Sequence, residues 1–319
     1  MMIIRTEEME TTSLKEKYGY MFEELAKVGK AASVIDETNV YQEANKFTRP
    51  FLNKMLDESL LPGSKIEGLE NFKDFLAQIK SGKRGLILME HYSNMDLPAI
   101  IYLLDRDGGE EGKEIADKIV AIAGMKLNEE NPMVRYWAES FTRVVIYPSR
   151  SLANLSEEER EAEEAKSRKI NMASMRAMDQ CKKDGKPILV FPAGTRYRPG
   201  NPETKKGVRE IDSYLRLFDI MIFVSVNGSC LRINPEKPND MLADQVHPDT
   251  VILGASPVVE CKKFRNDVLA TLEDYEGDKK VVVVEKVMEE LDKLHQQYRP
   301  EYERVYKEVT GEDVDIDQG

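Results

Sequence analysis

Short apolar runs alternate with longer amphipathic stretches along most of the chain. The apolar runs are rich in Val, Ile and Leu, which is typical of buried strands. They predict strands at residues 85–89, 118–123, 143–147, 187–191, 219–226 and 250–253. Apolar side chains at three- and four-residue spacing predict helices near residues 69–79, 97–105, 132–140, 157–183 and 208–218. This alternation predicts an α/β fold with a mixed, mostly parallel sheet that is flanked by helices.

The beginning of the chain shows helical spacing without a strand pattern. Apolar side chains recur every three or four residues within 14–30 and again within 41–59. The Leu-Pro-Gly-Ser stretch at 61–64 interrupts this pattern. We therefore expect a small N-terminal helical domain over residues 1–75 and an α/β domain over residues 76–319.

Two strongly charged stretches are expected at the surface. Residues 105–114, which include adjacent glycines, are expected to form a surface loop. Residues 157–169 predict the solvated face of a long helix. The same helix is expected to turn four apolar side chains toward the core, namely Ile170, Met172, Met175 and Met178.

The charge of the chain restricts its partners. Its 319 residues include 46 Lys and Arg against 58 Asp and Glu, which gives a formal charge of −12. Such a surface repels nucleic-acid phosphates and weakens binding to anionic membranes, so we expect no nucleic acid and leave only peripheral membrane contact open. No apolar run approaches the roughly 20 residues that span a bilayer, and the first residues do not resemble a targeting peptide. We expect a soluble, cytoplasmic protein with Cys181, Cys230 and Cys261 as buried thiols.

A histidine and an aspartate follow the strand predicted at 85–89. His91 lies at the carboxyl end of this strand, where open α/β sheets bind their ligands. Asp96, at the start of the next helix, could hold the imidazole by Nδ1 and leave Nε2 as a general base. In the alternative interpretation, Asn94 or Asp96 caps the helix and His91 is an ordinary loop residue.

Positive charge gathers after the strand predicted at 187–191. From position 196 to position 209 the sequence has five basic residues and one acidic residue, in a chain of net negative charge. Arg196 and Arg198 come directly after Gly194 and Thr195. Two guanidinium groups beside the backbone N–H groups of a turn suit a phosphate. An exposed basic loop without a ligand is the alternative.

A third candidate, Arg150, follows the strand predicted at 143–147. Taken alone, an arginine in this position is usually a surface residue. The carboxyl ends of parallel strands meet at one edge of a sheet. We therefore expect Arg150, His91 and the basic segment after 191 to converge on one cleft.

In this order, the three blocks resemble those of the glycerolipid acyltransferases. They are His-x4-Asp after a strand, a basic residue after a later strand, and Phe-Pro-x-Gly-Thr-Arg-x-Arg after a further strand. The segments LMEHYSNMDLPAIIYLL and FPAGTRYRPG are most similar to the soluble, plastid-type glycerol-3-phosphate acyltransferases. The clear resemblance covers roughly residues 83–230.

The resemblance implies a reaction and roles for the candidate residues. A fatty acyl group would move from a thioester on acyl carrier protein or coenzyme A to the 1-hydroxyl of glycerol 3-phosphate, the first step of phospholipid biosynthesis. The region 76–319 would be the catalytic domain. His91 would take the proton of the hydroxyl, and Asp96 would orient His91. The acceptor would be held by Arg150, Arg196 and Arg198, with Gly194 and Thr195 shaping the turn. We expect no metal and no cofactor, since the thioester is a co-substrate.

Three positions depart from the family pattern and leave alternatives open. Ala193 stands where many members have Glu, Ser151 follows the third strand where the plastid type has a further basic residue, and Ser225 stands where Pro is usual. The acceptor could instead be 1-acylglycerol 3-phosphate, or the protein could bind a phosphorylated ligand without catalysis. A metal-dependent hydrolase is disfavoured, because His247 and His295 lack a paired ligand in the sequence pattern.

Overall fold

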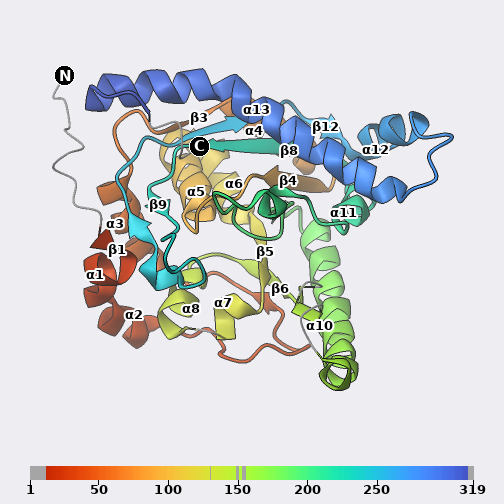
Figure 1. The fold of residues 1–319 in the computed structure, drawn as a ribbon, viewed down its shortest axis with the longest axis horizontal. Coiled ribbons are helices and arrows are strands. Elements are labelled where there is room, and N and C mark those ends of the chain that lie inside the picture. The colour runs from red at the N-terminus through yellow and green to blue at the C-terminus, as the bar shows by residue number, and fades with distance from the viewer. Residues whose placement is uncertain (1–11, 130, 149–150, 153–155, 315–319) are drawn as a thin grey trace.

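A large central sheet organises the molecule. The computed structural model describes residues 12–129, 131–148, 151–152 and 156–314. Within these residues the sheet has nine strands, in the order β2-β6-β5-β7-β4-β8-β11-β3, with β12 paired to β8 (Figure 1). The strands are β2 (Tyr41–Gln42), β3 (Lys65–Glu67), β4 (Gly85–Met89), β5 (Val120–Gly124), β6 (Arg143–Ile146), β7 (Ile188–Val190), β8 (Ile220–Asn227), β11 (Ile252–Ala255) and β12 (Val259–Glu260).

The centre of this sheet is parallel. Strands β6, β5, β7, β4 and β8 run in one direction, whereas β11 and β12 are antiparallel to β8 and β2 is antiparallel to β6. The six strands predicted from apolar runs all appear here within a few residues of their expected bounds. The α/β prediction with a mixed, mostly parallel sheet is therefore confirmed.

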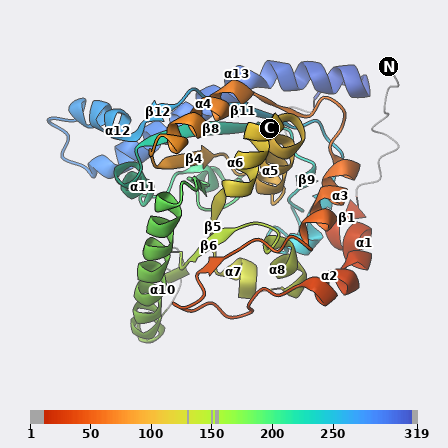
Figure 2. The ribbon, with the colours of Figure 1, turned by 180° about the vertical axis from the view of Figure 1, so that it is seen from behind.

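Helices cover both faces of the sheet (Figures 1 and 2). Side chains alternate along β4, so that Ile87 and Met89 pack in one hydrophobic core and Leu86 and Leu88 pack in another. The first core is covered by α3 (Arg49–Ser59), α4 (Leu69–Lys80), α5 (Asp96–Asp107), α6 (Gly109–Lys118) and α8 (Pro132–Ala138). The second is covered by α10 (Glu157–Lys183), α11 (Ile211–Leu217), α12 (Cys261–Ala270) and α13 (Lys279–Thr310). Among the described helices, none is both long enough and apolar enough to cross a bilayer.

The prediction of a strand-free N-terminal region is wrong. Helices α1 (Leu14–Tyr18) and α2 (Phe22–Val28) are present, but the segment 41–59 begins with β2 and becomes helical only at α3, which has a proline in its first turn. Strands β2 and β3 join the main sheet through β6 and β11. Strands of two or three residues are too short to show an alternating pattern. The domain boundary near residue 75 stays a prediction.

Two predictions about the charged stretches are also wrong. The expected loop at 105–114 is the end of α5 followed by α6. Gly112 lets α6 pack closely on α5, because a Cβ atom there would lie 2.4 Å from the Leu104 carbonyl oxygen. On α10, Ile170 and Met178 are buried, but Met172 and Met175 are 58% and 44% exposed. Positions two residues apart lie on nearly opposite sides of a helix, so Ile170 and Met172 cannot share a face.

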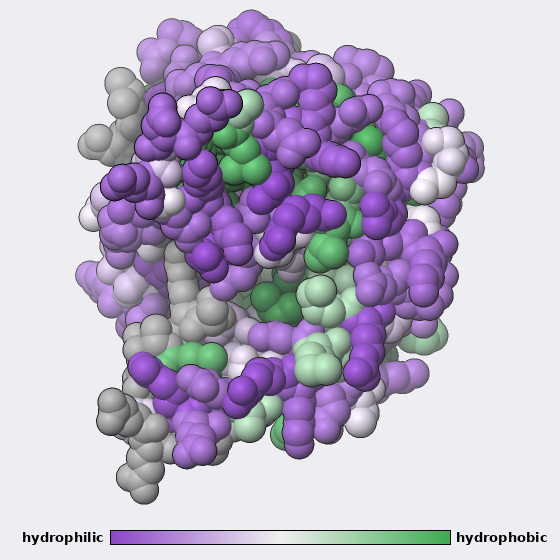
Figure 3. All heavy atoms as spheres, turned by 90° about the vertical axis from the view of Figure 1, so that its right-hand side faces the viewer, coloured by the Kyte–Doolittle hydropathy of each residue, from purple (hydrophilic) through white to green (hydrophobic). Residues whose placement is uncertain are grey.

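The outer surface agrees with the composition. Figure 3 shows a face that is mostly hydrophilic, with apolar residues gathered around a hollow near its centre. All three cysteines are buried free thiols, as predicted. Burial raises the pKa of Cys230 and of Cys261 to about 12, so these thiols stay protonated at neutral pH.

A second, smaller sheet lies beside the carboxyl end of β4. It joins β1 (Thr12–Ser13), β10 (Gln245–Val246) and β9 (Leu231–Arg232) in antiparallel order. The N–H of His247, directly after β10, donates to the Cys230 carbonyl oxygen at 3.1 Å. Burial, together with the charge of Arg232, lowers the pKa of His247 to about 4. This histidine is therefore neutral in the folded protein over the physiological range.

His247 makes the folded state sensitive to acid. Its unfolded pKa is about 6.5. The unfolded chain therefore takes up this proton first as the pH falls, and stability that is complete above pH 6.5 is lost as the pH falls toward 4. We expect His247→Gln to remove up to about 3 kcal/mol of this loss. Urea unfolding of both proteins at pH 7 and pH 4.5 measures it, and parallel pH profiles would contradict it.

Candidate active site

The loop between β4 and α5 holds His91 against Asp96. Nδ1 of His91 lies 2.9 Å from Oδ2 of Asp96. The same oxygen accepts hydrogen bonds from the backbone N–H groups of Tyr92 at 2.7 Å and Ser93 at 2.8 Å. A carboxylate oxygen accepts hydrogen bonds and does not donate them. The proton in the bond between His91 and Asp96 therefore lies on Nδ1 of His91. Nε2 of His91 is then left as the basic nitrogen.

The capping alternative for these residues does not match the structure. The residue that caps α5 is Met95, and no side chain makes a capping hydrogen bond there. The side chain of Asn94 instead donates to Asp244 at 3.2 Å. Asp96, which is 3% exposed, has its carboxylate turned into the loop that carries His91.

The imidazole of His91 is fixed on its other sides as well. Its ring stacks on Phe191, with 3.9 Å between the ring centroids and 13° between the planes. The backbone carbonyl oxygen of His91 accepts a hydrogen bond from the backbone N–H of Tyr197 at 2.7 Å. Phe191 and Tyr197 belong to the loop that follows β7, the neighbour of β4 in the sheet. The two loops therefore meet because their strands are parallel and adjacent.

A tight turn brings the second loop to the same place. Gly194 has a φ of +65°, a conformation that favours glycine, and its N–H donates to the Phe191 carbonyl oxygen at 2.9 Å. Beyond the turn, Nη1 of Arg198 donates to Oγ1 of Thr195 at 3.0 Å. The backbone N–H of Arg198 donates to Oγ1 of Thr204 at 2.9 Å.

Arg196 has a buried partner that the sequence did not indicate. Its Nη1 donates to Oδ2 of Asp244, and the side chains of the two residues are 7% and 0% exposed. Burial raises the pKa of Asp244 to about 6, although the charge of Arg196 acts in the opposite direction. Asp244 also accepts from Asn94, so one carboxylate connects the His91 loop with the basic loop. It lies 48 residues from Arg196 in the sequence, and no local motif marks it.

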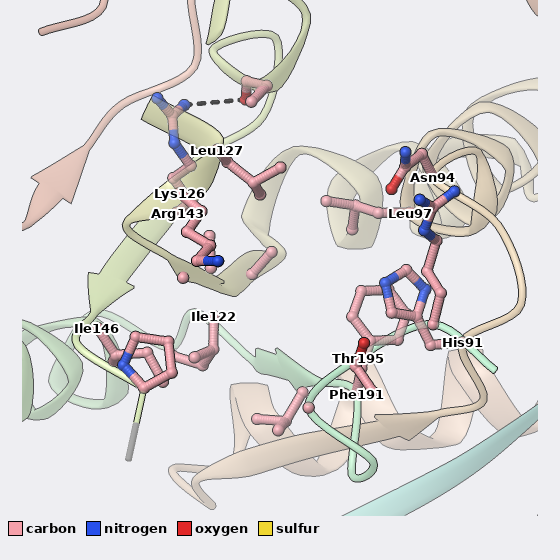
Figure 4. A pocket seen from close by; sticks show the side chains of 18 of the residues that line it. His91, Asn94, Leu97, Ile122, Lys126, Leu127, Arg143, Ile146, Phe191 and Thr195 are labelled. Atoms are coloured by element: carbon pink, nitrogen blue, oxygen red, sulfur yellow. Dashed lines mark hydrogen bonds between the residues drawn. The ribbon is translucent and has the colours of Figure 1, made fainter. Parts of the chain in front are cut away.

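These residues surround one cavity of about 740 Å³. The candidate residues that line it are His91, Gly194, Thr195, Arg196 and Arg198. Figure 4 shows His91, Phe191 and Thr195 on one side of the cavity, and Ile122, Leu127 and Lys126 facing them from the other side. Most of the remaining lining is apolar and includes Leu97, Val134, Trp137, Phe141, Met175 and Met178. The cavity thus combines a basic, hydrogen-bonding part with an apolar part, and its size suits a small-molecule site.

Asp96 and Arg150 differ from the other candidates. Asp96 lies behind His91 and does not line the cavity. Arg150 lies outside the described residues. Strand β6, which precedes it, ends at Ile146, and this residue lines the cavity.

Comparison with known protein families finds a match over the central part of the chain. Residues 64–222 match the family model described as Acyltransferase. This part of the chain is similar to the acyltransferases. This segment contains the His91 loop, the Arg196 loop and the central parallel strands. The match supports acyl transfer as the general activity, with an acyl donor and an acceptor as its substrates. No curated protein matches the chain.

The described residues were also compared with the donor sets of metal sites. Among the described residues, no cluster of three or more His, Cys, Asp or Glu side chains could hold a metal ion. His91 and Asp96 make a pair, and the Asp96 oxygen also accepts from the N–H groups of Tyr92 and Ser93.

The turn at Gly194 provides a test of the loop geometry. An alanine there would be strained by the positive φ, and its Cβ would lie 3.2 Å from Cγ1 of Val208. We expect Gly194→Ala to lower the free energy of unfolding by about 1–2 kcal/mol. Gly200→Ala is a matched control, because Gly200 has a φ of +81° with no atom within 4 Å of the added Cβ. Urea unfolding measures both, and equal losses would show that the contact with Val208 adds nothing.

Proposed function

We propose that this protein transfers a fatty acyl group from a thioester, on acyl carrier protein or coenzyme A, to the 1-hydroxyl of glycerol 3-phosphate. The observation that supports this most directly is the shared cavity of His91, Arg196 and Arg198. His91, whose Nδ1 is bonded to Asp96, would act there as the general base, and the two guanidinium groups would suit a phosphate. The acyltransferase match over residues 64–222 supports the same reaction class.

In the proposed step, Nε2 of His91 takes the proton of the acceptor hydroxyl. The oxygen attacks the thioester carbonyl carbon, a C–O bond forms, and the C–S bond of the donor breaks. The thiol leaves with the proton that His91 returns. Asp96 stabilises the imidazolium ion that exists between these two transfers. Burial raises the pKa of Cys181, Cys230 and Cys261, and none of them lines the cavity, which argues against a cysteine acyl-enzyme.

The two parts of the cavity would receive the two substrates. Thr195, Arg196 and Arg198 would bind the acceptor phosphate, together with Arg150 as the resemblance implies. The apolar lining that includes Trp137 and Phe141 would take the acyl chain, because burial of each CH₂ group contributes about 0.8 kcal/mol. The reacting carbonyl would then lie near His91, where the two parts meet.

A second acceptor fits the same observations. The lining of the cavity is mainly apolar, and 1-acylglycerol 3-phosphate would need apolar surface for its own chain. Release of free thiol from an acyl donor, measured with each acceptor in turn, distinguishes the two. Preference for the acylated acceptor would favour this second function. A protein that binds either phosphate compound without releasing thiol would be a non-catalytic binding protein.

The first test of the reaction is substitution of the base. We expect His91→Ala to lower kcat by about 10²- to 10⁴-fold, because the hydroxyl loses its proton acceptor. Asp96→Asn should lower kcat as well, since an amide no longer stabilises the imidazolium ion. His247→Gln is the control, because His247 does not line the cavity. Thiol release at saturating substrates measures all three, and full activity of His91→Ala would contradict the proposal.

The second test separates the phosphate from the rest of the acceptor. We expect Arg198→Gln to raise KM for glycerol 3-phosphate by about 10- to 100-fold, which corresponds to the loss of a hydrogen bond to a charged group. KM for the acyl donor should not change. Arg209→Gln is the matched control, because Arg209 belongs to the same basic segment but pairs with Asp278 away from the cavity. If KM for glycerol, which lacks the phosphate, rises by the same factor in Arg198→Gln, Arg198 does not bind the phosphate.

A further inference from the structure

A second histidine–carboxylate pair lies directly behind the loop that carries His91. Glu90, between β4 and His91, is 9% exposed. Its Oε2 accepts hydrogen bonds from the backbone N–H of Val226 and from Nδ1 of His295, both at 2.9 Å. Its Oε1 accepts from the hydroxyl of Tyr92 at 3.1 Å. Neither Glu90 nor His295 lines the cavity, so this pair does not touch a substrate bound there.

The direction of Glu90 follows from the alternation along β4. Leu86 and Leu88 face the core that α13 covers, and the side chain of Glu90 continues on that face. His91 points to the opposite side, toward the cavity. Glu90 and His91 are adjacent at the end of β4. Glu90 contacts α13 on one face of the sheet, and His91, the proposed base, lies on the other.

His295 is held firmly enough to act as an anchor. Its side chain is 7% exposed and lies on the buried face of α13. A carboxylate oxygen accepts hydrogen bonds and does not donate them. Nδ1 of His295 therefore donates its proton to Oε2 of Glu90, the oxygen that also accepts the Val226 N–H. The carbonyl oxygen of His295 accepts from the side chain of Asn227 at 3.3 Å. The helix is therefore bonded to both β8 and the His91 loop.

Tyr92 connects this pair to the proposed catalytic pair. Its hydroxyl donates to Glu90, and its backbone N–H donates to Oδ2 of Asp96. Its ring lies 5.7 Å from the ring of His295 and makes an edge contact with Tyr197 at 5.8 Å, measured between centroids. A shift of Tyr92 would therefore move a donor away from the Asp96 oxygen that holds His91.

We propose that His295 is a positioning residue for the His91–Asp96 pair and acts through Glu90 and Tyr92. The inference rests on the proposed function for its kinetic consequence. Without the imidazole, Glu90 loses one of its three donors in a buried place, and its side chain moves to find another. Tyr92 then moves with it, and the orientation of His91 is no longer unique. Displacements of about 1 Å at a reacting group cost on the order of 100-fold in rate.

The kinetic test compares substitutions at one position. We expect His295→Ala to lower kcat by about 10- to 100-fold, with KM for both substrates changed less than threefold. His295→Asn should recover most of kcat, because the asparagine Nδ2 occupies nearly the position of the histidine Nδ1 and also donates. A folded His295→Ala protein with the kcat of the original protein would overturn the proposal. So would a His295→Asn protein no better than His295→Ala.

Two controls on the same helix separate positioning from stability. Tyr302→Phe removes a buried hydrogen bond to Asp249 and leaves Glu90 untouched. Leu291→Ala removes buried packing on the face of α13 that carries His295. Both should lower Tm while kcat at a temperature well below Tm stays unchanged. If kcat falls in either control as it does in His295→Ala, general loosening of α13 explains the effect and the proposal fails.

A spectroscopic readout makes the inference independent of the reaction. The chain contains three histidines, so the imidazole signals in an NMR spectrum can be assigned with His91→Ala, His247→Gln and His295→Ala. We expect the Nδ1 proton of His91, which is bonded to Asp96, to shift or broaden in His295→Ala and to return in His295→Asn. An unchanged His91 signal overturns the proposal. If the signal changes but the original protein transfers no acyl group, the proposed function fails while the positioning role stands.

Discussion

A single carboxylate oxygen, Oδ2 of Asp96, holds the candidate site in its shape. It accepts the imidazole proton of His91 and two backbone N–H groups of the loop between them. These bonds close six residues into one turn, fix which nitrogen of His91 carries the proton, and start α5 at the same residue. The placement of the basic loop then follows, since its Phe191 stacks on an imidazole that is already immobile.

The sequence predicts the centre of the fold better than its edges. Strands such as β4 and β8 are buried on both faces, so their apolar runs are long enough to recognise. Strands β2 and β3 have two and three residues and exist because β6 and β11 offer them edges to pair with. Such pairing is decided by the rest of the sheet. The prediction of a loop at 105–114 was wrong for a related reason. Gly112 allows α6 to pack closely on α5, and this contact cannot be recognised from the sequence.

The candidate site was predictable to the extent that it is local. His91 and Asp96 lie five residues apart, and Arg196 and Arg198 follow one turn, so motifs report them. Asp244 and His295 are joined to these motifs only by the folded chain. Asp244 also changes the electrostatics, because Arg196, one of the three arginines predicted for the phosphate, is already balanced by a buried carboxylate. Arg150 stays a prediction.

Glu90 and His295 are 205 residues apart in the chain, so their contact closes a long segment. The support behind His91 is complete only when α13 packs on the sheet. Closing so long a segment costs conformational entropy that this docking must offset. Across small domains, folding is slower where more contacts join residues that are far apart in the sequence. Full order at the proposed catalytic base therefore depends on a helix that comes from a distant part of the chain.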